Sequence, residues 1–402
     1  MQRPIAVIFH RFGPYHCARL RAVAARGPAI GIEIVRKDTT NQWDVVDDPG
    51  GFRRVRLFPG PDGNQPSVGE IRRRLYRCLE KEQPRAVAVP GWSTPYALLA
   101  LSWCLNRATP AVLMSASTAL DKRRPFLADS VKRRLLRLYS AALAGGSRQL
   151  QYLRRLGFPG AAVFPGYDVV DNAHFDRFQP RDEAGPAARR SFLVCCRFIP
   201  VKNLPRLLGA YARYRQAAGS PAWELVIAGD GPESERLSGL MTALHLNGSV
   251  RLAGFVQYDG LPALYARAGA FILPSVSETW GLVVNEAMAA GLPVLVSNRC
   301  GCAPDLVEEG RNGFTFDPYD TEQLAGLMLR LSTMSDADRA AMGQASRQII
   351  SRWTPETFAT NLSKAIEAAL AAPRPKATLP DKALLWALIH RPASLPSLPL
   401  PK

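Results

Sequence analysis

Four charged residues in the second half of the chain have types and spacing that suit a phosphorylated sugar. Arg197 directly follows the apolar run SFLVCC, and Lys202 comes five residues later. A planar guanidinium and a mobile ammonium group together suit a diphosphate, although a structural ion pair is the alternative. Glu278 and Glu286 lie eight positions apart. Carboxylates are poor ligands for phosphate but accept hydrogen bonds from hydroxyl groups, so this pair indicates sugar recognition beside the phosphates.

A glycine marks the start of the helix that we expect to carry Glu286. The backbone N–H groups of Gly281 and Leu282 would be unpaired at that helix N-terminus, where the helix dipole favours an anion. A phosphate between the carboxylates of Glu278 and Glu286 is the arrangement of a nucleotide-sugar site. The alternative is a solvated glutamate at a helix start and a second glutamate placed by chance.

Short apolar runs alternate with helical patterns twice along the chain, which predicts an α/β protein. In the first half these runs are IAVIF, RAVAVP, AVLMS and AAVFP, and after the polar stretch 179–190 they are SFLVCC, WELVIAGD, SVRLAGF, AFILPS and PVLVSN. Such strands form parallel sheets with helices on both faces. We therefore predict two Rossmann-like domains joined near residue 185, which face each other across a cleft at the carboxyl ends of their strands.

Composition places the chain among soluble α/β proteins. Its 402 residues are 47% hydrophobic and 21% charged, and this length allows two domains. The seven cysteines contain no C-x-x-C motif and fit reduced thiols. The apolar stretch before His10 is too short for a signal peptide, and no apolar run is long enough to span a bilayer.

Positive charge is concentrated in the first half. Residues 1–180 hold 28 of the 51 Lys and Arg and 14 of the 34 Asp and Glu, which gives +14, against +3 for the rest. This excess would attract nucleic acid, anionic lipid or phosphorylated substrates, and a solvated basic surface is the alternative. The basic clusters are Arg53 to Arg56, Arg72 to Arg74, Lys122 to Arg124 and Lys132 to Arg134. Because aromatic and basic residues do not interleave, we do not expect nucleic-acid binding.

From Arg197 to about Leu370, the chain resembles the retaining glycosyltransferases of family 4, which have the GT-B fold. The motifs appear in the family's order: R-x4-K (197–202), GDGPE (229–233), L-x-G-F (252–255), E-x7-E (278–286) and EAMAAGLPVLVSN. The resemblance implies that Arg197 and Lys202 bind the donor's pyrophosphate and stabilise its charge during catalysis. It likewise implies that Glu278 contacts the transferred sugar and Glu286 the ribose hydroxyls.

The resemblance also implies that Gly281, Leu282 and Val283 supply backbone amides to the phosphates and the sugar. The other donor-binding positions are Gly13, Gly254 and Phe255. Two departures from the family pattern stand near them. Cys196 replaces the usual glycine before Arg197, and Gly301 to Asp305 (GCAPD) replaces the usual G-G-x-P-E.

The first half resembles the family less specifically. Gly13 and His16 follow the first strand, where GT-B enzymes have a glycine loop near the donor phosphate and the acceptor. His16 is either an acceptor-side residue or a polar residue of a first helical turn. Where many members have a histidine after a later strand, this chain has Ser115 to Thr118, so Ser117 would supply a hydroxyl to the acceptor side.

No metal site is expected. Asp168 and Asp171 have D-x-x-D spacing in place of the metal-binding D-x-D, and small-residue packing explains Cys195, Cys196, Cys300 and Cys302. The resemblance implies retention of anomeric configuration: the acceptor hydroxyl attacks from the leaving-group face, and the departing phosphate takes its proton. No cofactor is then required beyond the nucleotide-diphosphate sugar that acts as donor.

The domain boundaries that we predict are 1–182 for an acceptor-binding domain and 190–352 for a nucleotide-sugar domain. A helix over 353–372 should pack back toward the first domain, and a Pro-rich tail follows at 373–402. The apolar run ALLWALIH in that tail is too short to span a bilayer, and we expect it to pack on the protein or be disordered in preference to lying on a membrane.

The sequence therefore indicates a hexosyltransferase that acts on a hydroxyl of a glycan or lipid-linked acceptor in cell-envelope or exopolysaccharide synthesis. We expect a cytoplasmic protein whose partners include an anionic membrane surface, with peripheral association on the inner face of the cytoplasmic membrane. One alternative is a sugar-nucleotide epimerase of GT-B fold, although no matching catalytic carboxylate set appears in the first half. The other is a polyanion-binding protein, which would leave Glu278 and Glu286 unexplained.

Overall fold

The computed structural model describes residues 3–36, 43–47, 50–60, 66–121, 126–178 and 190–391. The basic cluster at 122–124, the linker expected near residue 185 and the end of the Pro-rich tail lie outside the described residues. The chain divides into two compact units. The first unit comprises Met1–Val169 and Pro355–Lys402, and the second comprises Val170–Thr354.

The first unit is built on a seven-stranded parallel sheet with strand order β3-β2-β1-β4-β5-β6-β7. Its strands are β1 (Ile5–Phe9), β2 (Ala29–Val35), β3 (Arg53–Phe58), β4 (Ala86–Pro90), β5 (Ala111–Ser115), β6 (Ala141–Ala144) and β7 (Val163–Phe164). Its helices are α1 (Pro14–Ala24), α2 (Val68–Glu82), α3 (Pro95–Asn106), α4 (Phe126–Leu136), α5 (Ser147–Arg155), α14 (Pro355–Ala371) and α15 (Leu379–Ile389), with a 3₁₀ turn at Gly160–Ala162.

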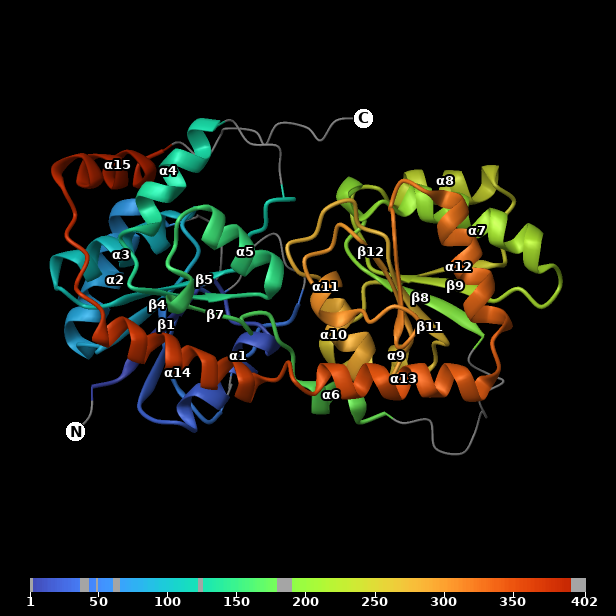
Figure 1. The fold of residues 1–402 in the computed structure, drawn as a ribbon, viewed down its shortest axis with the longest axis horizontal. Helices are drawn as coiled ribbons and strands as arrows, with labels where there is room; N and C mark the ends of the chain where they lie inside the picture. Colours follow the sequence, from blue (N-terminus) through green and yellow to red (C-terminus); the bar gives the residue numbers. More distant parts are fainter. Residues whose placement is uncertain are drawn as a thin grey trace. The chain divides into compact units, whose positions relative to one another are not determined.

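Both faces of this sheet are covered, as the continuous apolar strands predict. Ala6 and Ile8 of β1 belong to one core, which α2, α3 and α15 also line. Val7 and Phe9 are equally buried and alternate with them, so they point to the opposite face. Figure 1 shows α14, in orange-red, running beside α1, and the two helices are in contact.

The second unit repeats the winding with six parallel strands in the order β10-β9-β8-β11-β12-β13. Its strands are β8 (Ser191–Cys195), β9 (Glu224–Ala228), β10 (Val250–Gly254), β11 (Ala270–Leu273), β12 (Val294–Ser297) and β13 (Gly313–Phe316). Its helices are α6 (Asn172–Asp176), α7 (Leu204–Ala218), α8 (Ser234–Ala243), α9 (Leu261–Ala266), α10 (Leu282–Ala289), α11 (Ala303–Leu306), α12 (Thr321–Thr333) and α13 (Asp336–Ile350), with 3₁₀ turns at Pro200–Lys202 and Tyr258–Gly260.

The two units do not begin and end at the domain boundaries that we predicted from the sequence. Helix α6 was expected at the end of the first domain, but it belongs to the second unit. Its polar ends have partners near the end of α13: Asn172 Nδ2 donates to the Ile350 carbonyl at 3.0 Å, and Arg347 Nε lies 2.9 Å from Asp176 Oδ1. Helix α14, in contrast, belongs to the first unit, where it contacts α1, β6 and β7.

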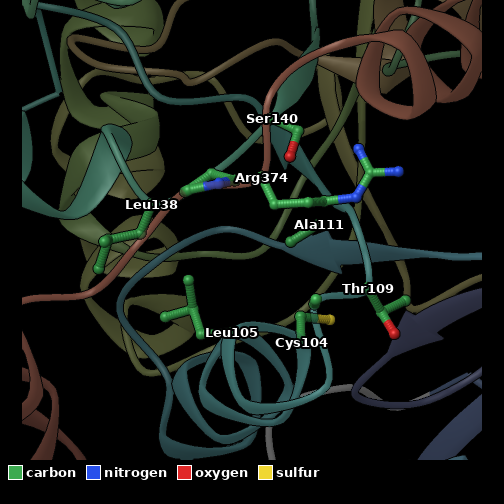
Figure 2. A pocket seen from close by; sticks show the side chains of 9 residues that line it. Cys104, Leu105, Thr109, Ala111, Leu138, Ser140 and Arg374 are labelled. Carbon is green, nitrogen blue, oxygen red and sulfur yellow. The ribbon is translucent and has the colours of Figure 1, made fainter.

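The segment after α14 is partly helical. Arg374 Nη1 donates to the carbonyl oxygens of Ala369 and Ala372 at 2.9 Å each, so it caps the end of α14. Its side chain also lines a small cavity with Ser140 beneath this segment (Figure 2). Helix α15 then packs Leu385 and Ile389 into the core of the first unit.

Candidate active site

An ion pair stands at the centre of the candidate site in the second unit. Lys202 ends the 3₁₀ turn after β8, Glu278 follows the neighbouring strand β11, and Lys202 Nζ bonds to Glu278 Oε2. The hydroxyl of Ser275 lies 3.4 Å from the same carboxylate oxygen. Burial, the largest single effect, lowers the pKa of Lys202, but the combined effects of its neighbours, Glu278 first among them, raise that pKa above its ordinary value. Lys202 is therefore a fully charged ammonium group.

A glycine turn fixes the backbone on either side of Arg197. The Cys196 N–H donates to the Ala228 carbonyl at 3.0 Å, and the Phe198 N–H donates to the Asp230 carbonyl at 2.8 Å. Gly229 has a φ of +140°, and a Cβ there would lie 1.8 Å from the Cys196 carbonyl oxygen. Only glycine permits this approach. The Arg197 side chain itself is exposed.

The replacement of the usual glycine by Cys196 leaves this loop well formed. Cys196 is half-buried, and burial raises the pKa of its thiol to about 12. It is therefore a neutral thiol beside Lys202 and Glu278, whose charges affect it in opposite directions. The substitution adds an apolar surface next to the ion pair and removes no charged group.

The N-terminus of α10 lies directly after the Glu278 loop. Gly281 caps the helix with a φ of +107°, and a Cβ there would lie 2.8 Å from Leu273 Cδ2. The first bond within the helix runs from the Val284 N–H to the Gly281 carbonyl at 2.9 Å. Leu282 and Val283 are partly buried and lie in the first turn, where backbone N–H groups have no helical acceptor.

Glu286 is almost completely buried, with 1% of its surface exposed. Tyr265 of α9 donates its hydroxyl to Glu286 Oε2 at 2.8 Å. Sequence reasoning missed Tyr265 because nothing in the spacing links it to Glu286, 21 positions later. Only the packing of α9 beside β11 and α10 brings the phenol to the carboxylate, and it orients the side chain expected to meet a ribose.

The loop that departs from the family's G-G-x-P-E holds the Glu278 segment in place. The Gly301 N–H donates to the Glu278 carbonyl at 2.9 Å, and the Cys302 N–H donates to the Trp280 carbonyl at 3.1 Å. Cys300 and Cys302 are buried free thiols. Backbone hydrogen bonds from this loop thus hold the Glu278 segment in place, and they do not involve the side chains that depart from the family pattern.

Gly254 and Phe255 complete the candidate donor residues of the second unit. Gly254 ends β10 with a φ of +70°, and its carbonyl accepts a 2.7 Å hydrogen bond from the Gly229 N–H. The loops after β8, β9 and β10 are therefore tied together at the carboxyl edge of one sheet. Phe255 follows with 37% of its surface exposed.

The candidate residues of the first unit lie at the carboxyl edge of its own sheet. The Gly13 N–H donates to His16 Nδ1 at 3.1 Å, so the proton of the neutral ring is on Nε2. Burial, assisted by Arg19 and Arg11, lowers the pKa of His16 to about 3. The Ser117 N–H donates to the Ser115 hydroxyl oxygen at 3.2 Å. The structure thus joins Gly13 to His16 after β1, whereas Ser117 lies after β5, with β4 between these two strands.

The aspartates of the D-x-x-D sequence are in different units. Asp168 lies in the first unit, and Asp171 in the second, where Asp171 Oδ1 lies 3.4 Å from the His174 N–H at the start of α6. Within the described ranges, no three His, Cys, Asp or Glu residues cluster as metal ligands would. Among the same residues, no helix has the length and apolarity needed to cross a bilayer.

Residues 176–349 match the family model for glycosyl transferases group 1. A GDP-mannose-dependent alpha-(1-6)-phosphatidylinositol monomannoside mannosyltransferase of Mycobacterium tuberculosis is 28% identical over 378 residues, which cover 85% of this chain and 90% of that protein. The sulfoquinovosyl transferase of Arabidopsis thaliana is 39% identical over 131 residues, which cover 32% of this chain and 24% of that protein.

Two solved structures share the fold over nearly the whole chain. Sucrose-phosphate synthase from Thermosynechococcus elongatus superposes with a TM-score of 0.73 at 19% identity, covering 92% of this chain and all of that one. Anabaena HepE in complex with UDP and glucose superposes with a TM-score of 0.69 at 18% identity, covering 91% and 100%. The fold is therefore that of the GT-B glycosyltransferases.

Proposed function

We propose that this chain, whose residues 176–349 match the family model for glycosyl transferases group 1, moves a hexosyl residue from a nucleotide-diphosphate donor to an acceptor hydroxyl with retention of configuration. One observation carries the donor assignment. Lys202 and Glu278 form an ion pair at the carboxyl edge of the second sheet, in the loops that carry Arg197 after β8 and lead from β11 to the N-terminus of α10. Cations and helix N–H groups suit a diphosphate, and the carboxylate suits a sugar.

Donor binding would divide this ion pair between two partners. Lys202 would turn its ammonium group toward the diphosphate, and Glu278 would accept hydrogen bonds from sugar hydroxyls. As the anomeric C–O bond breaks, negative charge grows on the departing phosphate, where Arg197, Lys202 and the α10 N–H groups would stabilise it. The acceptor hydroxyl attacks the anomeric carbon from the face that the phosphate leaves, and the departing phosphate oxygen takes the proton of that hydroxyl. This scheme requires neither a protein base nor a metal ion.

The acceptor is proposed to be a glycan or lipid-linked hydroxyl used in envelope or exopolysaccharide synthesis. The mycobacterial relative, which aligns over most of its length, is named for a lipid acceptor and for GDP-mannose. The positive charge of the first half supports a cytoplasmic enzyme docked at an anionic membrane surface. His16 and Ser117 would face the acceptor, with His16 as a neutral N–H donor.

The decisive experiment screens nucleotide sugars by thermal shift and donor hydrolysis, followed by calorimetry with UDP and GDP. We expect one nucleoside diphosphate to bind the wild type. Arg213→Ala is the control and should bind it equally, because Arg213 pairs with Glu322 away from the site. Lys202→Ala should bind it more weakly. If no nucleotide binds the wild type, the proposal is wrong.

A second measurement tests the absence of a metal requirement. Turnover should survive EDTA, because Arg197 and Lys202 would supply the positive charge. Loss of turnover in EDTA and its return with Mg²⁺ or Mn²⁺ would contradict the charge-stabilisation scheme. Epimer formation from the donor without any acceptor would instead favour the epimerase alternative.

A further inference from the structure

Helix α15 has two different faces. Leu385 and Ile389 are buried in the core of the first unit. On the outward face, Leu379 is 81% exposed and Trp386 is 66% exposed, the highest values among the large apolar side chains of the described residues. Ala383 and Ala387 are exposed on the same face. Packing within the protein therefore accounts for only half of this apolar helix.

The exposed face is held rigidly. Thr378 caps the helix: its N–H donates to Asp381 Oδ2 at 2.8 Å, and its hydroxyl bonds to the same oxygen at 2.6 Å. The hydrogen bonds from Thr378, with a smaller effect from Arg134, lower the pKa of Asp381 to about 2, so its carboxylate is ionised. Arg134 of α4 donates to Asp381 Oδ1 at 2.5 Å. Trp386 is thus presented from a capped helix that is attached to its neighbour.

Positive charge surrounds this apolar face. Lys376, Lys382 and Arg391 are exposed before, within and after α15. Figure 1 shows α15, in red, beside α4, which carries exposed Arg133 and is followed directly by exposed Arg137. The acidic residue of α15, Asp381, is already paired with Arg134. Exposed Trp386 and Leu379 with Lys and Arg side chains near them complement a surface that has an apolar interior and anionic groups on its outside.

We propose that α15 is an interfacial helix that docks the first unit on an anionic lipid bilayer. Trp386 and Leu379 enter the headgroup region, and the surrounding Lys and Arg side chains meet lipid phosphates. The inference rests on the membrane part of the proposed function and assigns it a structural element. A second copy of the chain fits less well, because two such faces would bring like charges together.

Flotation with vesicles tests the helix directly. The wild type should bind vesicles of phosphatidylcholine with about 30 mol% phosphatidylglycerol and should bind pure phosphatidylcholine weakly. Trp386→Ala should reduce partition into the mixed vesicles about tenfold, because it removes a large exposed apolar surface. Tyr319→Ala is the matched control: Tyr319 is 52% exposed in the second unit, and its loss should leave binding unchanged. Equal binding by wild type and Trp386→Ala would overturn the proposal.

Depth and self-association separate the remaining outcomes. Brominated lipids should quench part of the wild-type fluorescence, and Trp386→Phe should lose this quenching while it keeps vesicle binding. If Trp386→Ala instead changes the sedimentation of the protein in solution and leaves vesicle binding intact, the face is a protein interface and the proposal is wrong. Calorimetry with UDP and GDP separates this inference from the proposed function, since Trp386→Ala should bind nucleotide as the wild type does.

Discussion

Both units are parallel sheets with helices on their faces, but they differ in net charge. The first unit holds 33 Lys and Arg against 15 Asp and Glu, a net +18, whereas the second holds 18 against 19, a net −1. In the second unit, the functional candidates are held in close pairs, Lys202 with Glu278 and Tyr265 with Glu286. In the first unit, exposed arginines lie on α2, α4 and β3, and the candidate His16 is neutral. The unit with balanced charge thus holds the candidate donor site, and the unit with surplus positive charge holds the candidate membrane-binding surface.

The largest expected effect tests whether the chemistry depends on the paired charges of the second unit. Lys202→Ala should lower turnover about 100-fold to 1,000-fold, the usual result of removing one group that stabilises developing negative charge. Glu278→Ala should lower turnover with little change in nucleotide binding. Steady-state kinetics and calorimetry separate the two. If Glu278→Ala weakened UDP or GDP binding and left turnover intact, the assigned roles would be exchanged.

The next effect tests whether the surplus charge of the first unit serves a surface. Arg72, Arg73 and Arg77 are exposed on α2, and reversing all three to Glu should weaken binding to anionic vesicles by at least about 3 kcal/mol at low salt, near 1 kcal/mol for each lost cation. The loss should shrink as salt shortens the Debye length. Vesicle sedimentation measures this, and nucleotide binding by the same variant is the control. Unchanged vesicle binding would leave the α2 charges as a merely solvated surface.

A smaller effect is expected at Tyr265. Tyr265→Phe removes the hydroxyl that donates to the buried Glu286 carboxylate, a bond of about 1.5 to 3 kcal/mol. Nucleotide affinity should fall about tenfold, because the carboxylate loses its orientation. Tyr211→Phe is the control, since that phenol donates to the Trp223 and Ser249 carbonyl oxygens of the same unit. If both variants lose stability equally and neither loses nucleotide affinity, Tyr265 is structural.

The smallest effect concerns His16. Because folding lowers the pKa of His16 from 6.5 to about 3, the unfolded chain binds a proton there below pH 6.5 and the folded chain does not. Stability should therefore fall as pH decreases, by about 1 kcal/mol between pH 7 and 5.5. Urea denaturation at the two pH values measures this. His16→Gln should remove that part of the decrease, and His245→Asn, at an exposed position, should not. The same decrease in both variants would assign the pH dependence to other groups.

Sequence reasoning worked best where one motif carries several functional groups. The α/β class and most strands followed from apolar runs, although β2, β3, β6 and β13 were not among those runs, and the α10 N-terminus followed from Gly281. Contacts between distant segments could not be predicted this way. Tyr265 meets Glu286 only through packing, and α6 joins the second unit because Asn172 and Asp176 find partners near the end of α13. The difference between the two faces of α15 could not be predicted from the sequence either, since ALLWALIH is apolar on both sides of the helix.

The return of the chain to the first unit orders its synthesis. All residues of the second unit have left the ribosome when Thr354 emerges, but α1 then still lacks α14, its neighbour in the fold. Domains generally fold as units during translation, so the middle of the chain can close before its beginning. Until α14 arrives, the apolar surface of α1 that it covers remains open to chaperones. Helix α15 follows α14 in the chain, so the proposed membrane contact forms only after the strands of both sheets have been synthesised.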